Sequence, residues 1–192
     1  LEFRRVLFRS EAAASAAGVS FDGLAVEVID WLAAPEAEAL AAVLYERRKS
    51  KGMTIDGARN GVRNRLYFGN LMLTRGSADG LVAGSIASTP DMLRSAFHCV
   101  GTAPGIAIGS SCFVMDLRQP TLSGDTVLLY SDCGVNPDPT AEQLVDIAIS
   151  TIHTHNALVG SLPRVAFLSF STKGSASHPL VEKMAKAAEL TK

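Results

Sequence analysis

The sequence predicts an α/β protein, because short apolar runs that suit buried strands are followed directly by polar turns and amphipathic helices. The clearest example is residues 77–101, SADGLVAGSIASTPDMLRSAFHCVG. Its apolar run at 80–86 is rich in small residues, as expected for a strand inside a parallel sheet. Residues 163–190 repeat the order of apolar strand, polar loop and helix. A hydrophobic content of 47% in 192 residues is enough for a substantial core.

The first ten residues, LEFRRVLFRS, differ in composition from the Ala- and Ser-rich residues that follow. The string matches the translation of a widely used sequencing adapter, so we interpret residues 1–10 as an artefact and exclude them from the fold. A basic targeting arm is the alternative interpretation. For the rest we predict two partial α/β domains, residues 11–104 and 105–192, in what we interpret as an internal fragment of a longer reading frame.

Strand-like and helical patterns alternate in the first predicted domain. Residues 19–33 contain an apolar, strand-like piece, and Pro35 then opens a helix that Gly52 ends. Basic residues, Arg48 among them, cluster in the last turn of this helix, where cations favour the helix dipole. On spacing alone, that is the simplest explanation of the cluster. Residues 54–76 predict one or two helices that pack through an apolar stripe.

The segment at 77–101 has the outline of a phosphate site. Ser88 and Thr89 follow the predicted strand, and we predict that Thr89 caps the helix, with Pro90 at its first position. Free N–H groups at such a helix N-terminus bind anions, and Arg94 lies within reach of them. A routine connection between a strand and a helix explains the same residues, and the spacing alone favours that explanation.

The second predicted domain begins with a hairpin. Apolar strands at 106–117 and 126–132 are joined by a turn with Ser-Gly-Asp at its tip. Thr140 and Gln143 have the spacing of a capping box and predict the start of the next helix.

A polar loop, STKGSASH, follows a predicted buried strand at 163–171. Open α/β sheets bind ligands at the carboxyl ends of their strands, where this loop is expected. Lys173 and Gly174 can hold a phosphate there through a side-chain charge and an exposed backbone N–H. Pro179 then starts a last amphipathic helix.

Neither a metal site nor a disulfide framework is expected. Cys99, Cys112 and Cys133 are odd in number and widely spaced, so we expect all three to be reduced. His153 and His155 point to different faces of their helix, which is poor geometry for zinc. Cys133 would need a neighbouring base to act as a nucleophile, and none is evident, so we interpret it as a small buried residue.

The charge balance excludes several classes of partner. A formal net charge of −1 provides no electrostatic footprint for nucleic acid or an acidic membrane. No apolar run approaches the length that spans a bilayer, and no hydrophobic signal segment is recognisable. We therefore expect a cytoplasmic protein with neither nucleic-acid nor membrane partners.

Five segments resemble blocks of the phosphate acetyltransferase (phosphotransacetylase) family, in the family's order. Together they cover nearly all of residues 20–190, which is far more specific than any single motif. The resemblance implies two α/β domains with a mixed, mostly parallel sheet of the isocitrate dehydrogenase-like kind, both incomplete in this chain. The segments are YERRKSKGMT (45–54), LYFGNLML (66–73), ADGLVAGSIASTPDMLRSA (78–96), YSDCGVNPDPTAEQLVDIAISTI (130–152) and PRVAFLSFSTKGSASHPLVEKM (163–184).

The resemblance also implies reversible acyl transfer, in which acetyl-CoA and phosphate give acetyl phosphate and CoA. CoA is then a substrate, no metal or redox cofactor is needed, and a homodimer is suggested. Arg48 matches a family arginine that binds the phosphate-bearing substrates, and Arg94 matches a second arginine near the reacting phosphate. Arginines fork onto phosphate oxygens and offset charge as it moves toward the leaving phosphate.

The family's serine, arginine and aspartate for catalysis belong to an N-D-L-S-R-G block that these 192 residues do not contain. We therefore assign no catalytic residue, and we expect a parent phosphate acetyltransferase of which this fragment has little or no activity alone. Two alternatives stay open. One is a phosphate butyryltransferase, because a pocket discriminates one methylene by only ~1–3 kcal/mol. The other is a non-catalytic regulatory domain such as the one fused to malic enzymes.

Overall fold

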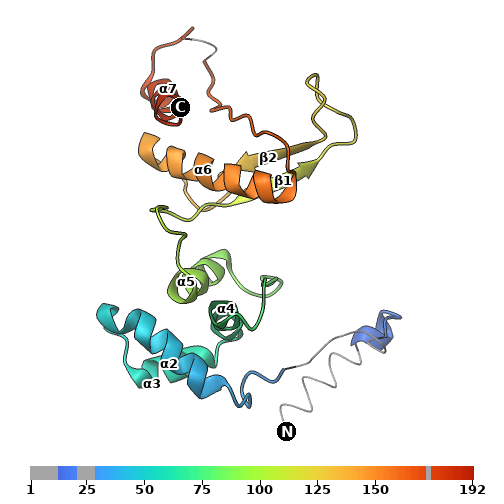
Figure 1. The fold of residues 1–192 in the computed structure, drawn as a ribbon, viewed down its shortest axis with the longest axis vertical. Coiled ribbons are helices and arrows are strands. Elements are labelled where there is room, and N and C mark those ends of the chain that lie inside the picture. Colours follow the sequence, from blue (N-terminus) through green and yellow to red (C-terminus); the bar gives the residue numbers. More distant parts are fainter. Residues whose placement is uncertain (1–12, 21–28, 172–173) are drawn as a thin grey trace. The chain divides into compact units, whose positions relative to one another are not determined.

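The computed structural model describes residues 13–20, 29–171 and 174–192. The chain divides into two compact units, Leu1–Gly101 (unit 1) and Thr102–Lys192 (unit 2) (Figure 1). In the described residues, unit 1 packs helices against helices, whereas unit 2 combines helices with a two-stranded sheet. That the two partial domains meet near Gly105 stays a prediction.

The helix predicted after Pro35 is α2, Ala37–Arg48. It continues as the short 3-10 helix η1, Lys49–Lys51, and ends at Gly52, whose φ of 85° is left-handed. Glycine adopts this conformation without the steric cost that a Cβ brings, which explains why the helix stops there as predicted.

Two further helices, α3 (Ile55–Val62) and α4 (Arg65–Arg75), account for residues 54–76. This confirms the prediction of one or two helices, and there are two. Each begins at a polar cap: the Thr54 hydroxyl accepts from the backbone N–H of Gly57, and the Asn64 side chain accepts from that of Leu66.

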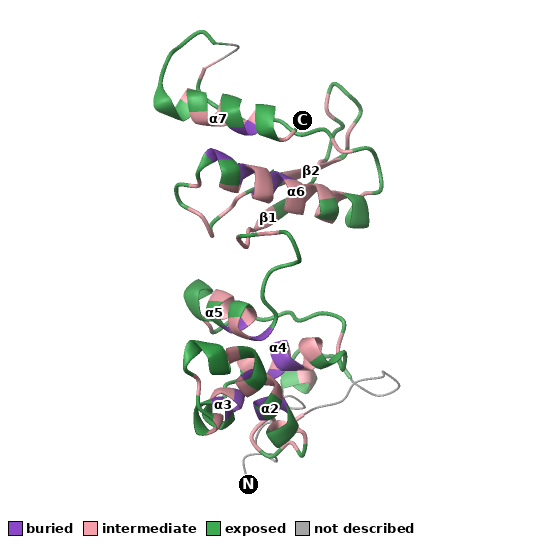
Figure 2. Cartoon of the chain, turned by 60° about the vertical axis from the view of Figure 1, so that its left-hand side comes forward, coloured by how far each residue is buried: buried purple, intermediate pink, exposed green. Residues whose placement is uncertain are grey.

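The core of unit 1 lies where these helices meet α5, Thr89–Cys99 (Figure 2). Partly buried Trp31 and Tyr67 pack around it. The fully buried side chains come from all four helices, so burial of apolar surface holds them together. They are Leu40, Leu44, Ala58, Val62, Leu71 and Cys99.

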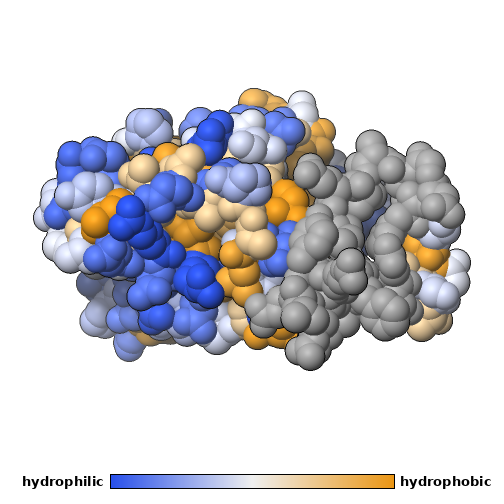
Figure 3. All heavy atoms as spheres, turned by 90° about the horizontal axis from the view of Figure 1, so that it is seen from below, coloured by the Kyte–Doolittle hydropathy of each residue, from blue (hydrophilic) through white to orange (hydrophobic). Residues whose placement is uncertain are grey.

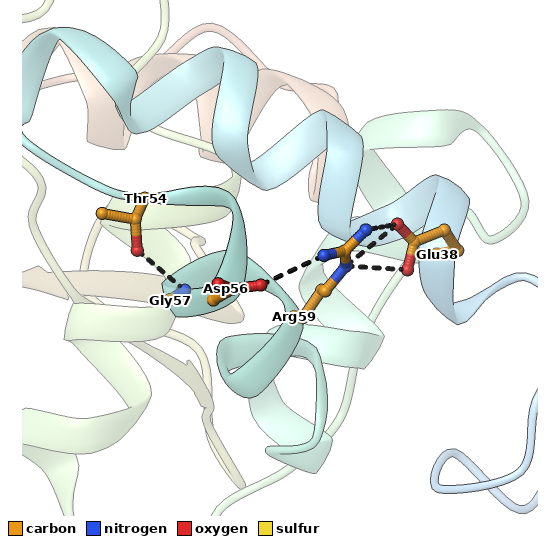
Figure 4. A network of polar contacts seen from close by, with 5 residues as sticks. All are labelled: Glu38, Thr54, Asp56, Gly57 and Arg59. Carbon is orange, nitrogen blue, oxygen red and sulfur yellow. Dashed lines mark hydrogen bonds and ion pairs between the residues drawn. The ribbon is translucent and has the colours of Figure 1, made fainter.

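A polar network joins α2 to α3 on the surface of unit 1 (Figure 4). Arg59 donates from Nε and Nη2 to Glu38 at 2.7–3.1 Å and from Nη1 to Asp56 at 3.0 Å. The hydrogen bond from Arg59 lowers the pKa of Glu38. Because these side chains are exposed, the network orients the helices more than it stabilises them.

The strand predicted at 80–86 is wrong. These residues form no strand, and Val82 and Ile86 are exposed. A parallel strand needs neighbours that supply backbone hydrogen bonds and cover both of its faces. The described part of unit 1 offers no strand to pair with, so the apolar pattern alone does not produce one. The strand-like piece at 19–33 falls largely on residues 21–28, which lie outside the described residues.

The predicted hairpin of unit 2 is confirmed. β1 (Cys112–Asp116) pairs antiparallel with β2 (Val127–Ser131), and Cys112 lies opposite Ser131. The turn between them is closed by Thr121 and Asp125, which hydrogen-bond through backbone and side chains.

Helices α6 (Ala141–Leu158) and α7 (Pro179–Leu190) complete unit 2. The capping box at the start of α6 forms as predicted, because Thr140 and Gln143 each accept a hydrogen bond from the other's backbone N–H. A small core between the helices is extended by partly buried side chains from the loops and from α7. It comprises Ala141, Leu144, Ile147 and Ala187, with Ile108, Phe167 and Met184 around them.

The second predicted strand, at 163–171, is also wrong. The segment is not part of the sheet, and Leu168 and Phe170 are exposed. In the described residues of unit 2 only β1 and β2 pair, so the sheet is antiparallel and the predicted parallel strands are not found there.

Figure 3 views the chain from below Figure 1 and shows mostly hydrophilic residues over the described surface, with apolar residues between them. Among the described residues, no helix is both long and apolar enough to cross a bilayer.

Candidate functional site

In unit 1, the side chains best suited to binding a charged group lie where α2, α4 and α5 meet. Arg48 is the last residue of α2, Tyr67 lies on α4, and Arg94 and His98 lie one turn apart on α5. Residues four apart share a helix face, so Arg94 and His98 project on the same side. We call these four residues the His98 cluster.

One buried and one exposed hydrogen bond hold together the helices that carry the cluster. Asn70 on α4 donates to the hydroxyl of Ser95 on α5 at 3.1 Å. Arg47, next to Arg48, donates to the backbone oxygen of Val100 at 2.6 Å. The ends of α2 and α5 are therefore held together independently of the cluster itself.

His98 contacts two other members of the cluster. Its Nε2 lies 3.4 Å from Nη2 of Arg48, and its Nδ1 lies 2.8 Å from the hydroxyl of Tyr67. The rings of Tyr67 and His98 meet edge to face, with centroids 5.8 Å apart. The Nε of Arg48 is buried and has no hydrogen-bond partner within the described residues. A guanidinium group in this state retains hydrogen-bonding capacity for a further acceptor.

The electrostatic environment of the cluster is positive. Burial lowers the pKa of His98, and the charges of Arg48 and Arg94 lower it further. Both cations therefore act on the same imidazole. Burial also raises the pKa of Tyr67 and raises the pKa of the Cys99 thiol to about 12, so neither adds negative charge at neutral pH. Two cations beside two neutral polar side chains form a site suited to a multiply charged anion.

The N-terminus of α5 differs from the prediction by one residue. Ser88, not Thr89, is the cap, because Ser88 has extended backbone angles and its hydroxyl accepts from the backbone N–H of Asp91 at 3.2 Å. Thr89 is already the first helical residue, so Pro90 moves to the second position, where its missing N–H still costs no helix hydrogen bond.

Asp91 pairs with the polar side chains of Ser88 and Arg94 at this helix end. Its carboxylate accepts from the Ser88 hydroxyl at 2.7 Å and from Nη1 of Arg94 at 3.0 Å. The Arg94 side chain is 59% exposed, so this ion pair is open to solvent and readily exchanged. An anion that binds Arg94 must displace or share the Asp91 contact.

The remaining predicted site residues, Lys173 and Gly174, belong to unit 2. Lys173 falls outside the described residues. Gly174 is exposed and has a φ of 79°. Their part in a phosphate site stays a prediction.

Unit 2 also contains a cavity of about 500 Å³, lined by β2, α6 and residues 161–168. Its walls are mainly apolar, and the charged residues that line it, Asp125 and Arg164, pair with each other at 2.6 Å. His155 lines the cavity too, and its Nδ1 is buried with no hydrogen-bond partner in the described part of the chain. The charged side chains that line the cavity are thus already paired with each other, which does not favour a phosphate there.

The sequence predicted Arg48 and Arg94 as site residues and did not single out His98 and Tyr67, which the structure places beside Arg48. The four-residue spacing of Arg94 and His98 was the available signal, but nothing in it indicates that Arg48 and Tyr67 arrive from other helices. In the described residues, no three His, Cys, Asp or Glu side chains are grouped so as to hold a metal ion.

Comparison with known proteins identifies relatives along almost the whole chain. The family model described as "Phosphate acetyl/butaryl transferase" matches residues 6–192. The phosphate acetyltransferase of Thermoanaerobacterium thermosaccharolyticum is 47% identical over 166 residues, which cover 86% of this chain and 51% of that protein. That of Acetivibrio thermocellus is 43% identical over 177 residues, 92% of this chain and 53% of that protein.

Solved structures agree with these matches. The EutD phosphotransacetylase from Staphylococcus aureus has a TM-score of 0.78 and 32% identity, over 96% of this chain and 53% of that one. A phosphotransacetylase from Streptococcus pyogenes has a TM-score of 0.74 and 30% identity, over 97% of this chain and 60% of that one. The chain thus spans about half the length of the curated relatives it matches. These matches confirm the resemblance found in the sequence, and the chain belongs to the phosphate acetyl/butyryl transferase family.

Proposed function

We propose that the protein to which this chain belongs is a phosphate acetyltransferase, which moves an acetyl group reversibly between CoA and phosphate. The observation that carries the proposal is that Nη2 of Arg48 lies 3.4 Å from Nε2 of His98, on the helix face that Arg94 shares, in a chain of this family. Phosphate and acetyl phosphate are multiply charged, and paired guanidinium groups both bind and orient such groups.

In the direction that makes acetyl-CoA, the sulfur of CoA bonds to the acetyl carbon and the bond from that carbon to the phosphate oxygen breaks. The leaving phosphate takes the electron pair, and the thiol proton passes to a general base. Arg48 and Arg94 hold the phosphate and offset its growing charge. Arg94 reaches it by exchanging the exposed contact with Asp91. The base and the donor to the tetrahedral oxyanion belong, in this proposal, to the family's N-D-L-S-R-G block.

Several finer features belong to the same proposal. The complete protein has two α/β domains with a mostly parallel sheet, acts as a homodimer and works in the cytoplasm. Ser88, Thr89, Lys173 and Gly174 contribute to phosphate binding. Acetyl is preferred over butyryl as the acyl group, in keeping with the printed names of the relatives.

Thioester formation from CoA and acetyl phosphate tests the reaction. It is measured side by side on this chain and on a chain extended through the N-D-L-S-R-G block, with butyryl phosphate as the competing substrate. Activity in the extended chain alone supports the proposal. If both chains fold and neither is active, the regulatory-domain alternative is favoured instead.

Phosphate affinity tests the assigned arginines. The affinity for inorganic phosphate is measured by calorimetric titration. It is expected to fall by about 10- to 150-fold in Arg48→Ala, since hydrogen bonds to charged groups contribute ~1.5–3 kcal/mol. The exposed Arg94 is screened by water, so Arg94→Ala is expected to lose only about fivefold. Arg75→Ala, an exposed arginine in the last turn of α4, is the matched control and should bind normally. Unchanged affinity in both cluster variants would remove the phosphate site from this position.

A further inference from the structure

The two hydrogen bonds of His98 determine where its ring proton lies. A guanidinium group only donates hydrogen bonds, so Nε2, which faces Nη2 of Arg48 at 3.4 Å, must be the unprotonated, accepting nitrogen. The proton of a neutral imidazole then lies on Nδ1, which donates to the Tyr67 hydroxyl at 2.8 Å. Arg48 thereby selects the tautomer, and the Tyr67 hydroxyl, which can donate or accept, accepts from Nδ1.

The groups that face His98 favour this neutral form. Arg48 approaches from α2, and Arg94 lies one turn earlier on α5 itself. Tyr67 faces the ring from α4, and Cys99, the next residue along α5, is a buried thiol. Asp91 is the nearby carboxylate, and it is paired with Arg94. A proton on Nε2 would therefore point at a cation with no anion of its own to offset the charge.

We propose that His98 is a positioning residue of the phosphate site: its unprotonated Nε2, with the ring held by Tyr67 at Nδ1, keeps the guanidinium group of Arg48 in place for the anion. This inference rests on the proposed function and extends it to a residue outside the matched arginines. Protonation of His98 removes the acceptor and repels Arg48, so phosphate binding weakens in acid beyond the effect of phosphate's own titration.

Two substitutions at His98 separate the two ring nitrogens. The side chain of His98→Gln places an amide near the position of Nε2, where its oxygen accepts from Arg48 without titrating. His98→Asn places its amide near Nδ1, which retains a partner for Tyr67 but leaves Arg48 without an acceptor. We expect His98→Asn to bind inorganic phosphate about three- to tenfold more weakly at neutral pH, the loss of one hydrogen bond, and His98→Gln to bind more tightly than His98→Asn.

The pH dependence distinguishes positioning from packing. The ratio of the dissociation constants of His98→Gln and the unsubstituted chain is followed from about pH 8 to about pH 4. This range extends well below the ordinary histidine pKa of about 6.5, because burial, Arg48 and Arg94 lower the pKa of His98. Phosphate's own protonation cancels in this ratio. Relative to His98→Gln, the unsubstituted chain is expected to lose affinity as the pH falls. A constant ratio, or tighter binding by the unsubstituted chain in acid, would overturn the proposal.

Nitrogen-15 NMR of the histidine ring provides a readout that does not need phosphate to bind. At neutral pH the spectrum should show a protonated Nδ1 and an unprotonated Nε2 in His98. Arg48→Ala should shift the ring toward a mixture of tautomers, because the Tyr67 hydroxyl pairs with either one. A protonated Nε2 in the unsubstituted chain overturns the inference. If the expected tautomer is found but phosphate does not bind, the proposed function fails while the Arg48–His98 contact stands. Tyr67→Phe, which removes the hydrogen-bond partner that holds the ring at Nδ1, serves as the second binding variant if His98→Asn does not fold.

Discussion

Replacing Asp132 with alanine is expected to destabilise unit 2 more than any other single carboxylate change there. Asp132 lies directly after β2 and organises the loop that leads to α6. Its carboxylate accepts hydrogen bonds from four donors in this loop and from two on Ser111, just before β1. These donors are the backbone N–H and hydroxyl of Ser111, the backbone N–H groups of Gly134, Val135 and Asn136, and the side-chain amide of Asn136.

The size of the effect follows from these contacts. Removing a charged acceptor costs ~1.5–3 kcal/mol for each bond that is left unmade. The loop is only half-buried, however, so water replaces most of the lost partners. We therefore expect Asp132→Ala to lower the free energy of unfolding of unit 2 by ~2–4 kcal/mol, and Asp132→Asn by less, because an amide oxygen still accepts.

Hydrogen exchange at individual amides measures this change. The N–H groups of Gly134, Val135 and Asn136 should exchange much faster in Asp132→Ala than in the unsubstituted chain, together with those of the first turn of α6. Asp116→Asn, which removes an exposed carboxylate at the end of β1, is the control. Equal exchange rates in Asp132→Ala and the control would refute the role given to this carboxylate.

The same carboxylate predicts acid sensitivity. Burial raises the pKa of Asp132, but hydrogen bonds from the Ser111 side chain, Gly134 and Asn136 outweigh burial and hold the pKa well below the ordinary aspartate value. A lowered folded-state pKa means that the unfolded chain binds the proton first. The stability that Asp132 contributes is therefore complete above about pH 4 and is lost as the pH falls below it. In Asp132→Asn, the free energy of unfolding of unit 2 should therefore depend less on pH in this acid range.

Three further changes test the packing and capping. Leu44→Ala removes a fully buried side chain from the core of unit 1 and should cost ~2–5 kcal/mol, measured by urea unfolding with the fluorescence of Trp31, whose ring packs on that core. Because Ser88 is the cap of α5, Ser88→Ala should cost ~1 kcal/mol in the same assay, and Thr89→Ala only a few tenths of a kcal/mol. The reverse order would support Thr89 as the cap. Thr140→Ala should cost ~1 kcal/mol by breaking the capping box, seen as faster amide exchange in the first turn of α6, and unchanged exchange would contradict it.

Helix ends were predictable because their signals are local. Gly52 ends the first helix, and Thr140 with Gln143 starts α6, through contacts between residues a few positions apart. The hairpin was predictable for a similar reason, since its two strands are close in the sequence, with only residues 117–126 between them. The one-residue error at Ser88 and Thr89 arose because both residues can cap, and only the backbone angles distinguish them.

The two missing strands show the limit of this local information. Residues 80–86 and 163–171 have apolar patterns that suit strands, but a strand forms only when another strand supplies its hydrogen bonds. Sequence patterns describe what a segment can bury and not whether a partner lies beside it. In the described residues no such partner reaches these segments.

By itself, the sequence determined the family, the helices and the hairpin, and it pointed to Arg48 and Arg94 as binding residues. Only the tertiary structure decided that His98 lies against Arg48 and Tyr67, which are 50 and 31 positions away along the chain. The physical reason is that helix caps and turns are stabilised by near neighbours, whereas the His98 cluster exists only after burial of Leu44, Leu71 and Cys99 packs α2, α4 and α5 together.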